Sequence, residues 1–170
     1  MASTLMTRSI TGVIFAAVMI SGTFFSSWTF LSLYFLITIF CLWEYASLVL
    51  EVQPSPFTTS LRRSAAVILG MLPFPVGLAL LMYETDLAQV YGMPASSLII
   101  GTLLSVFLLF VFELFARGEK PFENVAKSLL GMVYIGIPFS LMPLLAIFPG
   151  EEAGSIVFEP WLALGLLFII

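Results

Sequence analysis

The sequence has no histidine, a single cysteine and few charged residues, which make up 9% of its 170 positions. Without histidine, the chain offers no His-ligated metal site, no Ser-His-Asp triad and no imidazole for acid–base catalysis. The lone Cys41 lies in an apolar run, so an internal disulfide is excluded and an oxidising compartment is not indicated. Ten acidic residues against six basic ones give a net charge of −4, which argues against a nucleic acid partner.

Apolar residues dominate what is present: they make up 61% of the chain, and the mean hydropathy is +1.14. An ordinary soluble domain carries about 25% charged residues, so this composition is typical of a polytopic membrane protein.

No charged residue lies between Arg8 and Glu44, and one helix of that length would be about 50 Å long, against a hydrocarbon core of roughly 30 Å. Small polar residues at 21–23 and 26–27, followed by Trp28, favour a turn at the membrane interface. We therefore predict a helical hairpin with spans near 10–25 and 28–50. A cleavable signal peptide is the alternative, but no A-x-A site is present.

Four further apolar runs follow the hairpin, at residues 64–83, 95–115, 125–148 and 161–170. The segments between them are predicted loops: a juxtamembrane loop at 51–63, a loop at 84–94, a polar loop at 116–124, and an acidic loop that contains Glu151, Glu152 and Glu159. The last apolar run has about half the length that a span needs. We predict an all-α fold, a polytopic transmembrane helix bundle with about five full spans and a truncated sixth, forming one membrane domain over residues 1–170.

The basic residues test this layout. If all six segments cross the membrane, every basic residue falls on one side, and the loops on the other side carry only acidic or neutral residues; the basic residues are Arg8, Arg62, Arg63, Arg117, Lys120 and Lys127. Positively charged loops face the cytoplasm in most membrane proteins. The N-terminus is therefore predicted to be cytoplasmic.

Two carboxylates, Glu44 and Glu113, are embedded in apolar runs. A carboxylate in hydrocarbon is costly unless it is paired or hydrated, so both are candidates for a polar cytoplasmic pocket; a structural or interfacial role is the alternative, because both lie near the predicted cytoplasmic interface. Arg117 and Lys120 are candidates for contacts with lipid headgroups or phosphate, and the alternative is that they only set the orientation. Prolines in the third and fifth spans indicate either kinks that serve packing or a cavity lined by broken helices; they are Pro73, Pro75, Pro138 and Pro143.

Four segments carry a resemblance to a known family: TRSITGVIFA at the start, CLWEYASL at the end of the second span, FENVAKSLLGMVYIGIPFSLMPLL across the fifth, and WLALGLLFII at the end. In this order they resemble the N-terminal half of the CdsA-type phosphatidate cytidylyltransferases. No phosphate-binding G-x-x-x-x-G-K-[ST] motif and no G-x-G-x-x-G motif is present. The residues alone therefore indicate the architecture and the orientation of the protein in the membrane, but they do not indicate which reaction it catalyses.

The resemblance implies an integral membrane nucleotidyltransferase of phospholipid biosynthesis, which makes CDP-diacylglycerol and pyrophosphate from CTP and phosphatidic acid with Mg²⁺. A bacterial inner membrane suits the length and the basic-inside pattern, and a homodimer is a possible assembly. The catalytic and metal-binding residues of the family lie in the half expected beyond residue 170, so none is assigned to this chain. We expect residues 1–170 alone to be inactive. The alternative function is a non-enzymatic transporter subunit or scaffold, and a polyprenol kinase-like enzyme is a further one.

Overall fold

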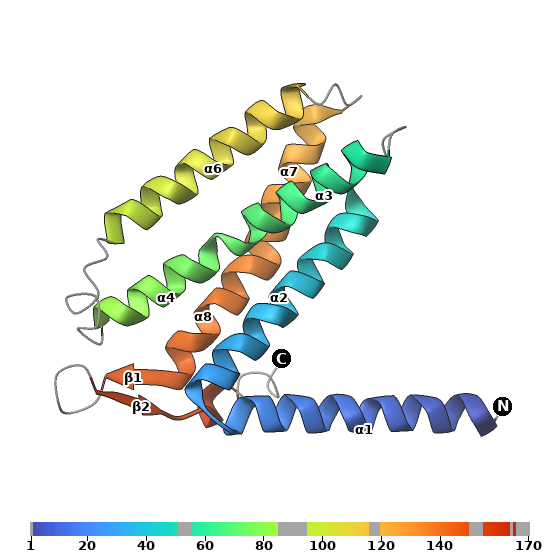
Figure 1. Cartoon of the computed structure of the whole chain (residues 1–170), viewed down its shortest axis with the longest axis vertical. Helices are drawn as coiled ribbons and strands as arrows, with labels where there is room; N and C mark the ends of the chain where they lie inside the picture. Colours follow the sequence, from blue (N-terminus) through green and yellow to red (C-terminus); the bar gives the residue numbers. More distant parts are fainter. Residues whose placement is uncertain are drawn as a thin grey trace.

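The computed structural model describes residues 2–50, 56–84, 95–115, 120–149, 155–163 and 165. Its helices form a bundle that carries a two-stranded hairpin at one end (Figure 1). In chain order the elements are α1 Ala2–Phe24, α2 Ser27–Val49, α3 Pro56–Met71, α4 Pro73–Glu84, α6 Ala95–Phe115, α7 Pro121–Gly131, the π-helix η1 Met132–Gly136, α8 Ile137–Ala146, β1 Ile147–Pro149 and β2 Ile156–Phe158.

Four helical segments in the described residues are long and apolar enough to cross a membrane: Met6–Phe24, Ser27–Val49, Phe57–Leu81 and Pro121–Ala146. The prediction of an all-α membrane bundle is therefore confirmed. The predicted fourth span coincides with α6, whose 21 residues also reach the length that a span requires.

The turn between the first two spans lies where the serines predicted it. Ser26 is the N-cap of α2: its hydroxyl accepts a hydrogen bond from the Trp28 amide at 3.4 Å, and the Thr29 hydroxyl accepts one from the Ser26 amide at 2.9 Å. This capping box satisfies amides that the first turn of a helix leaves without partners. The chain must therefore leave α1 at Phe24 and begin a new helix within three residues.

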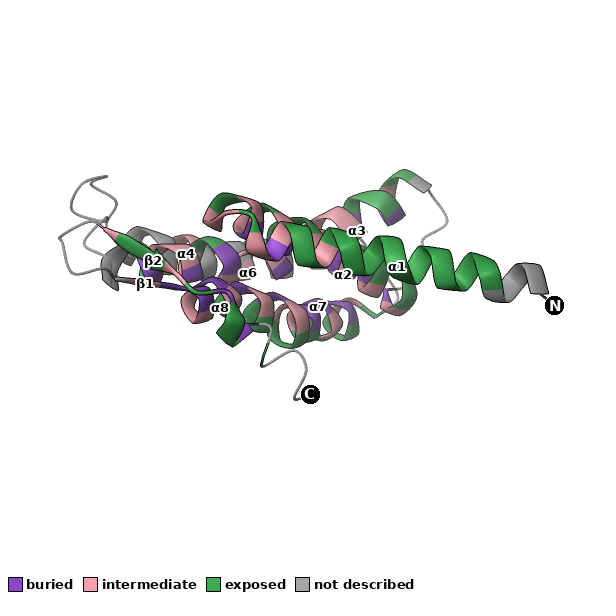
Figure 2. Cartoon of the chain, turned by 90° about the horizontal axis from the view of Figure 1, so that it is seen from below, coloured by how far each residue is buried: buried purple, intermediate pink, exposed green. Residues whose placement is uncertain are grey.

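The hairpin geometry was wrong in one respect, because α1 does not pack back along α2. The two helices diverge from the turn (Figure 1), and α1 is exposed along nearly its whole length (Figure 2). Only 6% of its apolar window is buried, against 39% for the span Phe57–Leu81. The cause is that the contact with α2 is confined to the turn, where Gly22 lets Leu33 approach closely.

The predicted loop at 51–63 was also wrong in its second part, because α3 begins at Pro56. Proline suits the first turn of a helix, where its missing amide costs no hydrogen bond. The predicted third span is interrupted at Leu72, whose amide donates to Leu69 O at 3.1 Å, and α4 begins at Pro73. The same correction applies to the loop at 116–124, because α7 begins at Pro121.

The fifth predicted span is one continuous rod made of α7, η1 and α8. In η1 the hydrogen bonds reach one residue further than in an α-helix, and Ile137 N–H donates to Met132 O. The next residue is Pro138, which cannot donate to the preceding turn. A π-turn is a common way for a helix to absorb such a local disturbance.

Glycines bring the third and fifth spans into direct backbone contact. A Cβ atom on Gly136 would collide with the carbonyl oxygen of Gly70 and would lie 3.4 Å from Pro73 Cγ. A Cβ atom on Gly77 would collide with the carbonyl oxygen of Ser140. In lipid, helices associate through close packing of small residues rather than through hydrophobic burial. The break at Leu72 and the π-turn thus lie against each other, which fits the packing interpretation of the prolines.

Two buried clusters line α2. One surrounds its first half and contains Phe30, Tyr34, Phe74, Leu81, Ala146, Ile147 and Ala163. The other surrounds its second half and contains Leu42, Ala46, Leu50, Ala66 and Val67. Since both clusters include residues of α2, this helix packs against the third and fifth spans along most of its length.

The acidic loop predicted after the fifth span is partly a β-hairpin, and strand β1 also takes Phe148 out of the predicted span. Strands β1 and β2 are antiparallel, with Phe148 opposite Val157. Glu159 follows β2, and its amide donates to Ala146 O at 2.7 Å. Glu151 and Glu152 lie outside the described residues. Of the predicted sixth run, residues 161–163 and 165 are helical, and the rest also lies outside them.

Candidate functional site

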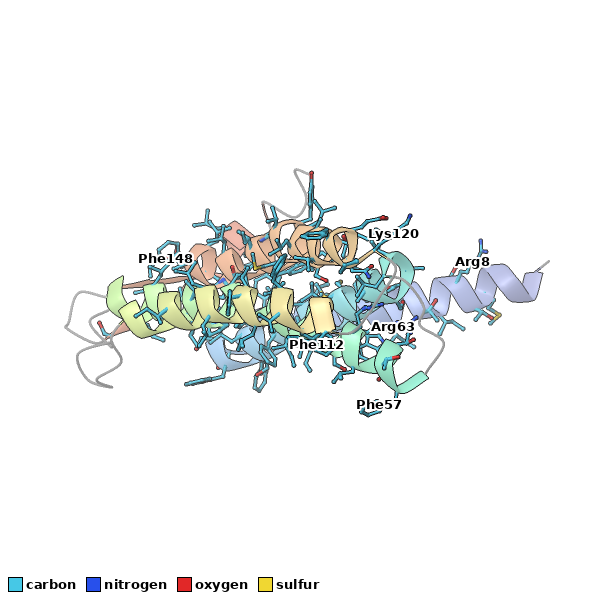
Figure 3. All side chains as sticks on the ribbon, turned by 90° about the horizontal axis from the view of Figure 1, so that it is seen from above. Arg8, Phe57, Arg63, Phe112, Lys120 and Phe148 are labelled. Atoms are coloured by element: carbon cyan, nitrogen blue, oxygen red, sulfur yellow. The ribbon has the colours of Figure 1, made fainter. Side chains whose placement is uncertain are left out.

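The two ends of the bundle differ in chemistry. Arg63 and Lys120 lie toward one end, and Phe148 lies toward the other (Figure 3). We call the first the basic end, formed by the C-terminal part of α2 and the N-terminal parts of α3 and α7. The opposite end carries the β-hairpin and two exposed indoles, Trp28 and Trp161. The basic residues of α3 and α7 thus share one end, whereas α1, which carries Arg8, leaves the bundle from the other end (Figure 1), and Arg117 lies outside the described residues.

Arg62 is the largest fully buried side chain at the basic end, with 1% of its surface exposed. It lies in the second turn of α3 and makes a polar interaction inside the bundle. An arginine side chain on a helix points back toward the helix N-terminus, so its guanidinium is directed to the basic end. A permanent cation is thereby held within the bundle near this end.

Asn124 and Ser128 supply buried polar groups from α7, with 1% and 3% exposure. Because Gly136 meets Gly70 and α3 and α7 run in the same direction (Figure 1), Arg62 is about level with Ser128. The Ser128 hydroxyl donates to Asn124 O at 2.9 Å. The Asn124 side-chain amide nitrogen has no hydrogen-bond partner, and neither does Arg63 Nε.

Charged side chains at the start of α7 form two ion pairs, in which Lys120 and Glu123 are exposed and Lys127 is partly exposed. Glu123 Oε1 lies 2.8 Å from Lys127 Nζ, and Glu123 Oε2 lies 3.4 Å from Lys120 Nζ. These pairs have the helical spacings i,i+4 and i,i+3, and Glu123 lies in the first turn, where the helix dipole favours an anion. Exposed pairs of this kind contribute little to stability, so both ammonium groups stay available to an anionic ligand.

Tyr45 joins α2 to α7 at the same end. Its hydroxyl donates to Lys127 O at 3.0 Å, and its ring lies over Gly131, where a Cβ atom would come within 2.8 Å of Tyr45 Cε1. The backbone segment that carries the Lys127 side chain is therefore held against α2.

Of the four residues singled out from the sequence, the structure describes the side chains of Glu44 and Lys120. Glu44 is exposed on α2, beside the half-exposed Trp43, so it lies outside the buried polar cluster. Lys120 is exposed and paired with Glu123. Glu113 belongs to α6, but its side chain lies outside the described residues, as does Arg117.

Sequence reasoning missed the buried polar residues of the basic end, namely Arg62, Asn124 and Ser128. A signal was available for Asn124, because Pro121 followed by Glu123 is a helix-start pattern that would have moved residues 121–124 out of the loop. No such signal was available for Arg62. In the sequence, two adjacent arginines indicate only a charged loop, and the packing of the helices decides which of the two side chains points into the bundle.

The described residues do not fit a metal centre, because no group of three or more His, Cys, Asp or Glu side chains lies together within them. No chemical step through Mg²⁺ is therefore derived from this chain. What the basic end offers is a set of cations and amide or guanidinium donors, which recognise phosphate oxygens.

Comparison with known proteins gives one match. A family model described as the Cytidylyltransferase family matches residues 6–158, which is most of the chain. A search of curated proteins and a search of solved structures each found no match. The matched residues include all four membrane-crossing segments and both faces of the contact between the third and fifth spans. The chain therefore belongs to the cytidylyltransferase family, as a membrane-spanning member.

Proposed function

We propose that this chain belongs to a phosphatidate cytidylyltransferase, a membrane enzyme that makes CDP-diacylglycerol from phosphatidic acid and CTP. The family match across the membrane-crossing segments carries this proposal. A cytidylyltransferase built into a bilayer has a natural acceptor in a phospholipid headgroup. The resemblance of CLWEYASL and of the fifth span to the phosphatidate-specific enzymes supports the same choice.

In the proposed reaction, a phosphate oxygen of phosphatidic acid bonds to the α-phosphorus of CTP. The bond between the α-phosphorus and the bridging oxygen breaks, and pyrophosphate leaves with its electron pair. Both substrates are anions, so their approach is favoured by a surface with exposed cations. Lys120 and Lys127 give the basic end this character, and the donors on Arg63 and Asn124 lie next to it.

The role proposed for this chain is to hold and orient the anionic substrates at the basic end, which is the cytoplasmic end in the predicted orientation. Mg²⁺ dependence and a bacterial inner membrane are parts of the same proposal: the first rests on the resemblance, and the second on the length of the chain and its basic-inside pattern. When bound, Mg²⁺ would neutralise phosphate charge. The alternative function, a transporter subunit or scaffold, has no separate observation in its favour.

The test is an assay on membranes from cells that express the complete gene product. We expect label from radioactive CTP to enter a lipid only when phosphatidic acid is added, and EDTA to abolish the transfer. Membranes with residues 1–170 alone are expected to show no transfer. Transfer to another lipid acceptor in place of phosphatidic acid would contradict the substrate, and a complete product without any transfer would favour the scaffold.

A further inference from the structure

Two grooves flank the beginning of α2 at the end of the bundle opposite the basic end. The longer one has a volume of about 400 Å³ and lies between α2 and α4, where its lining residues are Trp28, Leu31, Ser32, Phe35, Leu36, Phe74 and Leu78. The second has a volume of about 380 Å³ and lies between α1 and α2, where its lining residues are Val18, Ser21, Gly22, Trp28, Thr29, Ser32 and Leu33. Trp28 and Ser32 line both, so they form a ridge between the two grooves.

The shape of the longer groove fits a lipid chain. From Trp28 to Leu36 it follows α2 for about 12 Å, close to the roughly 15 Å depth of one leaflet. Its walls are apolar and include the edge-to-face pair Phe35 and Phe74, whose ring centroids are 5.3 Å apart. Its side chains belong to membrane-crossing segments, so in the bilayer the groove is surrounded by acyl chains.

The ridge sets the depth at which such a lipid would lie. Trp28 is 76% exposed at the first turn of α2, and tryptophan concentrates at the level of the headgroups and ester bonds. Trp161 is 71% exposed at the same end and packs against Phe24 in a tilted arrangement, with ring centroids 4.6 Å apart. The two indoles mark one interface, and both grooves run from it toward the bilayer centre.

The divergence of α1 from α2 explains why there are two grooves. If α1 packed along α2, it would close the second groove; instead it leaves an opening that begins at Gly22 and is lined by Ser21 and Thr29 near the interface. A glycerophospholipid has two chains that leave one polar group side by side. Two grooves on either side of a single ridge match this pattern, whereas a second copy of the chain would need one continuous face.

We infer that the two grooves beside Trp28 hold the two acyl chains of one phospholipid, drawn from the leaflet opposite the basic end. This lipid is distinct from a substrate, because the cations that would meet an anionic substrate lie at the other end of the bundle. The inference does not rest on the proposed function, and its test measures lipid retention rather than turnover.

The decisive variant is Ser32→Phe, because Ser32 lines both grooves and is exposed, so a larger side chain fills the grooves without entering the core. The matched control is Ser60→Phe, the same change at an exposed position of α3 outside both grooves. The protein is purified in mild detergent from membranes, and the phospholipid that remains is counted by native mass spectrometry. We expect about one molecule per chain in the unaltered protein and in Ser60→Phe, and none in Ser32→Phe.

A second measurement reports position. In the background Trp43→Phe with Trp161→Phe, Trp28 is the remaining tryptophan. The protein is loaded from vesicles of phosphatidylcholine with brominated acyl chains and transferred to plain detergent. Quenching of Trp28 fluorescence should persist, and Ser32→Phe should remove it. Equal lipid counts in Ser32→Phe and Ser60→Phe, complete recovery of fluorescence after transfer, or a change in oligomeric mass with unchanged lipid would each overturn the inference.

Discussion

Arg62 is the residue whose surroundings differ most from those of an ordinary membrane-flanking arginine. It keeps its charge while 1% exposed, and it has a polar interaction inside the bundle. A guanidinium stays protonated at any physiological pH, so it cannot escape burial by becoming neutral. The polar interaction that it makes inside the bundle must therefore offset part of its lost hydration.

Replacing Arg62 with leucine should therefore destabilise the bundle by about 1–3 kcal/mol, since the group that Arg62 contacts inside the bundle loses its polar partner. The midpoint of unfolding by SDS in mixed micelles measures the change. Lys120→Leu is the control, because Lys120 is exposed, and its midpoint should stay at the unaltered value. Equal midpoints for Arg62→Leu and the unaltered protein would show that the burial of this charge contributes no stability.

Tyr45 offers a cleaner change, because one hydroxyl is removed. Tyr45→Phe loses the hydrogen bond to Lys127 O and should cost about 0.5–1.5 kcal/mol of unfolding free energy. Tyr134→Phe is the matched control, because Tyr134 is 72% exposed. The same SDS titration compares them, and a larger loss in Tyr134→Phe would contradict the assigned contact.

At the scale of elements, the sequence determined where most helices lie but not how they are interrupted. The turn at Ser26 and the span Ala95–Phe115 could be predicted, because capping residues and apolar run lengths are local signals. The start of α7 at Pro121 was also within reach. The π-turn η1 was not, since Pro138 signals a local disturbance without specifying its form, and the contact of Gly136 with Gly70 joins residues distant in the chain.

The glycine contacts give a prediction for two elements at once. Gly136→Ala and Gly77→Ala each place a methyl group against a backbone carbonyl of the facing helix, so the third and fifth spans must separate. We expect each to cost about 1–3 kcal/mol of unfolding free energy. Gly12→Ala is the matched control, because nothing lies within 4 Å of the added atom.

For the control, the unfolding midpoint should stay the same or rise slightly, because alanine favours a helix over glycine. A Gly136→Ala protein as stable as Gly12→Ala would mean that the two spans are not in contact at this level. Thermal unfolding followed by circular dichroism in detergent is an independent readout of the same difference.

The candidate site shows the same limit at the level of single side chains. Glu44 and Tyr45 are neighbours on α2, yet Glu44 is exposed and Tyr45 contacts α7. The rotation of α2 about its own axis decides which of the two side chains enters the bundle. When a helix is apolar on all sides, the pattern of apolar residues does not predict this rotation. The sequence could therefore locate the basic end but not choose its inward-facing members.

At the scale of the whole molecule, the separation of the basic end from the hairpin end predicts orientation. Cys41→Ser removes the native thiol, and a single cysteine is then placed at Ser60 or at Val157, both exposed. If the basic end is cytoplasmic, a membrane-impermeant maleimide added to intact cells should label Val157→Cys, and Ser60→Cys only after permeabilisation. The reverse pattern would place the N-terminus outside.

The close contact between Gly70 and Gly136 also bears on how the protein is made. At ribosomal rates of about 5–20 residues per second, the third span emerges several seconds before the segment that covers its glycines. During that interval Gly77 presents bare backbone to the bilayer, whereas Gly70 already has Leu42 of α2 beside it. Biogenesis of this protein thus includes a period in which lipid or an insertase must shield that face, and a slower ribosome would lengthen the period without changing the finished fold.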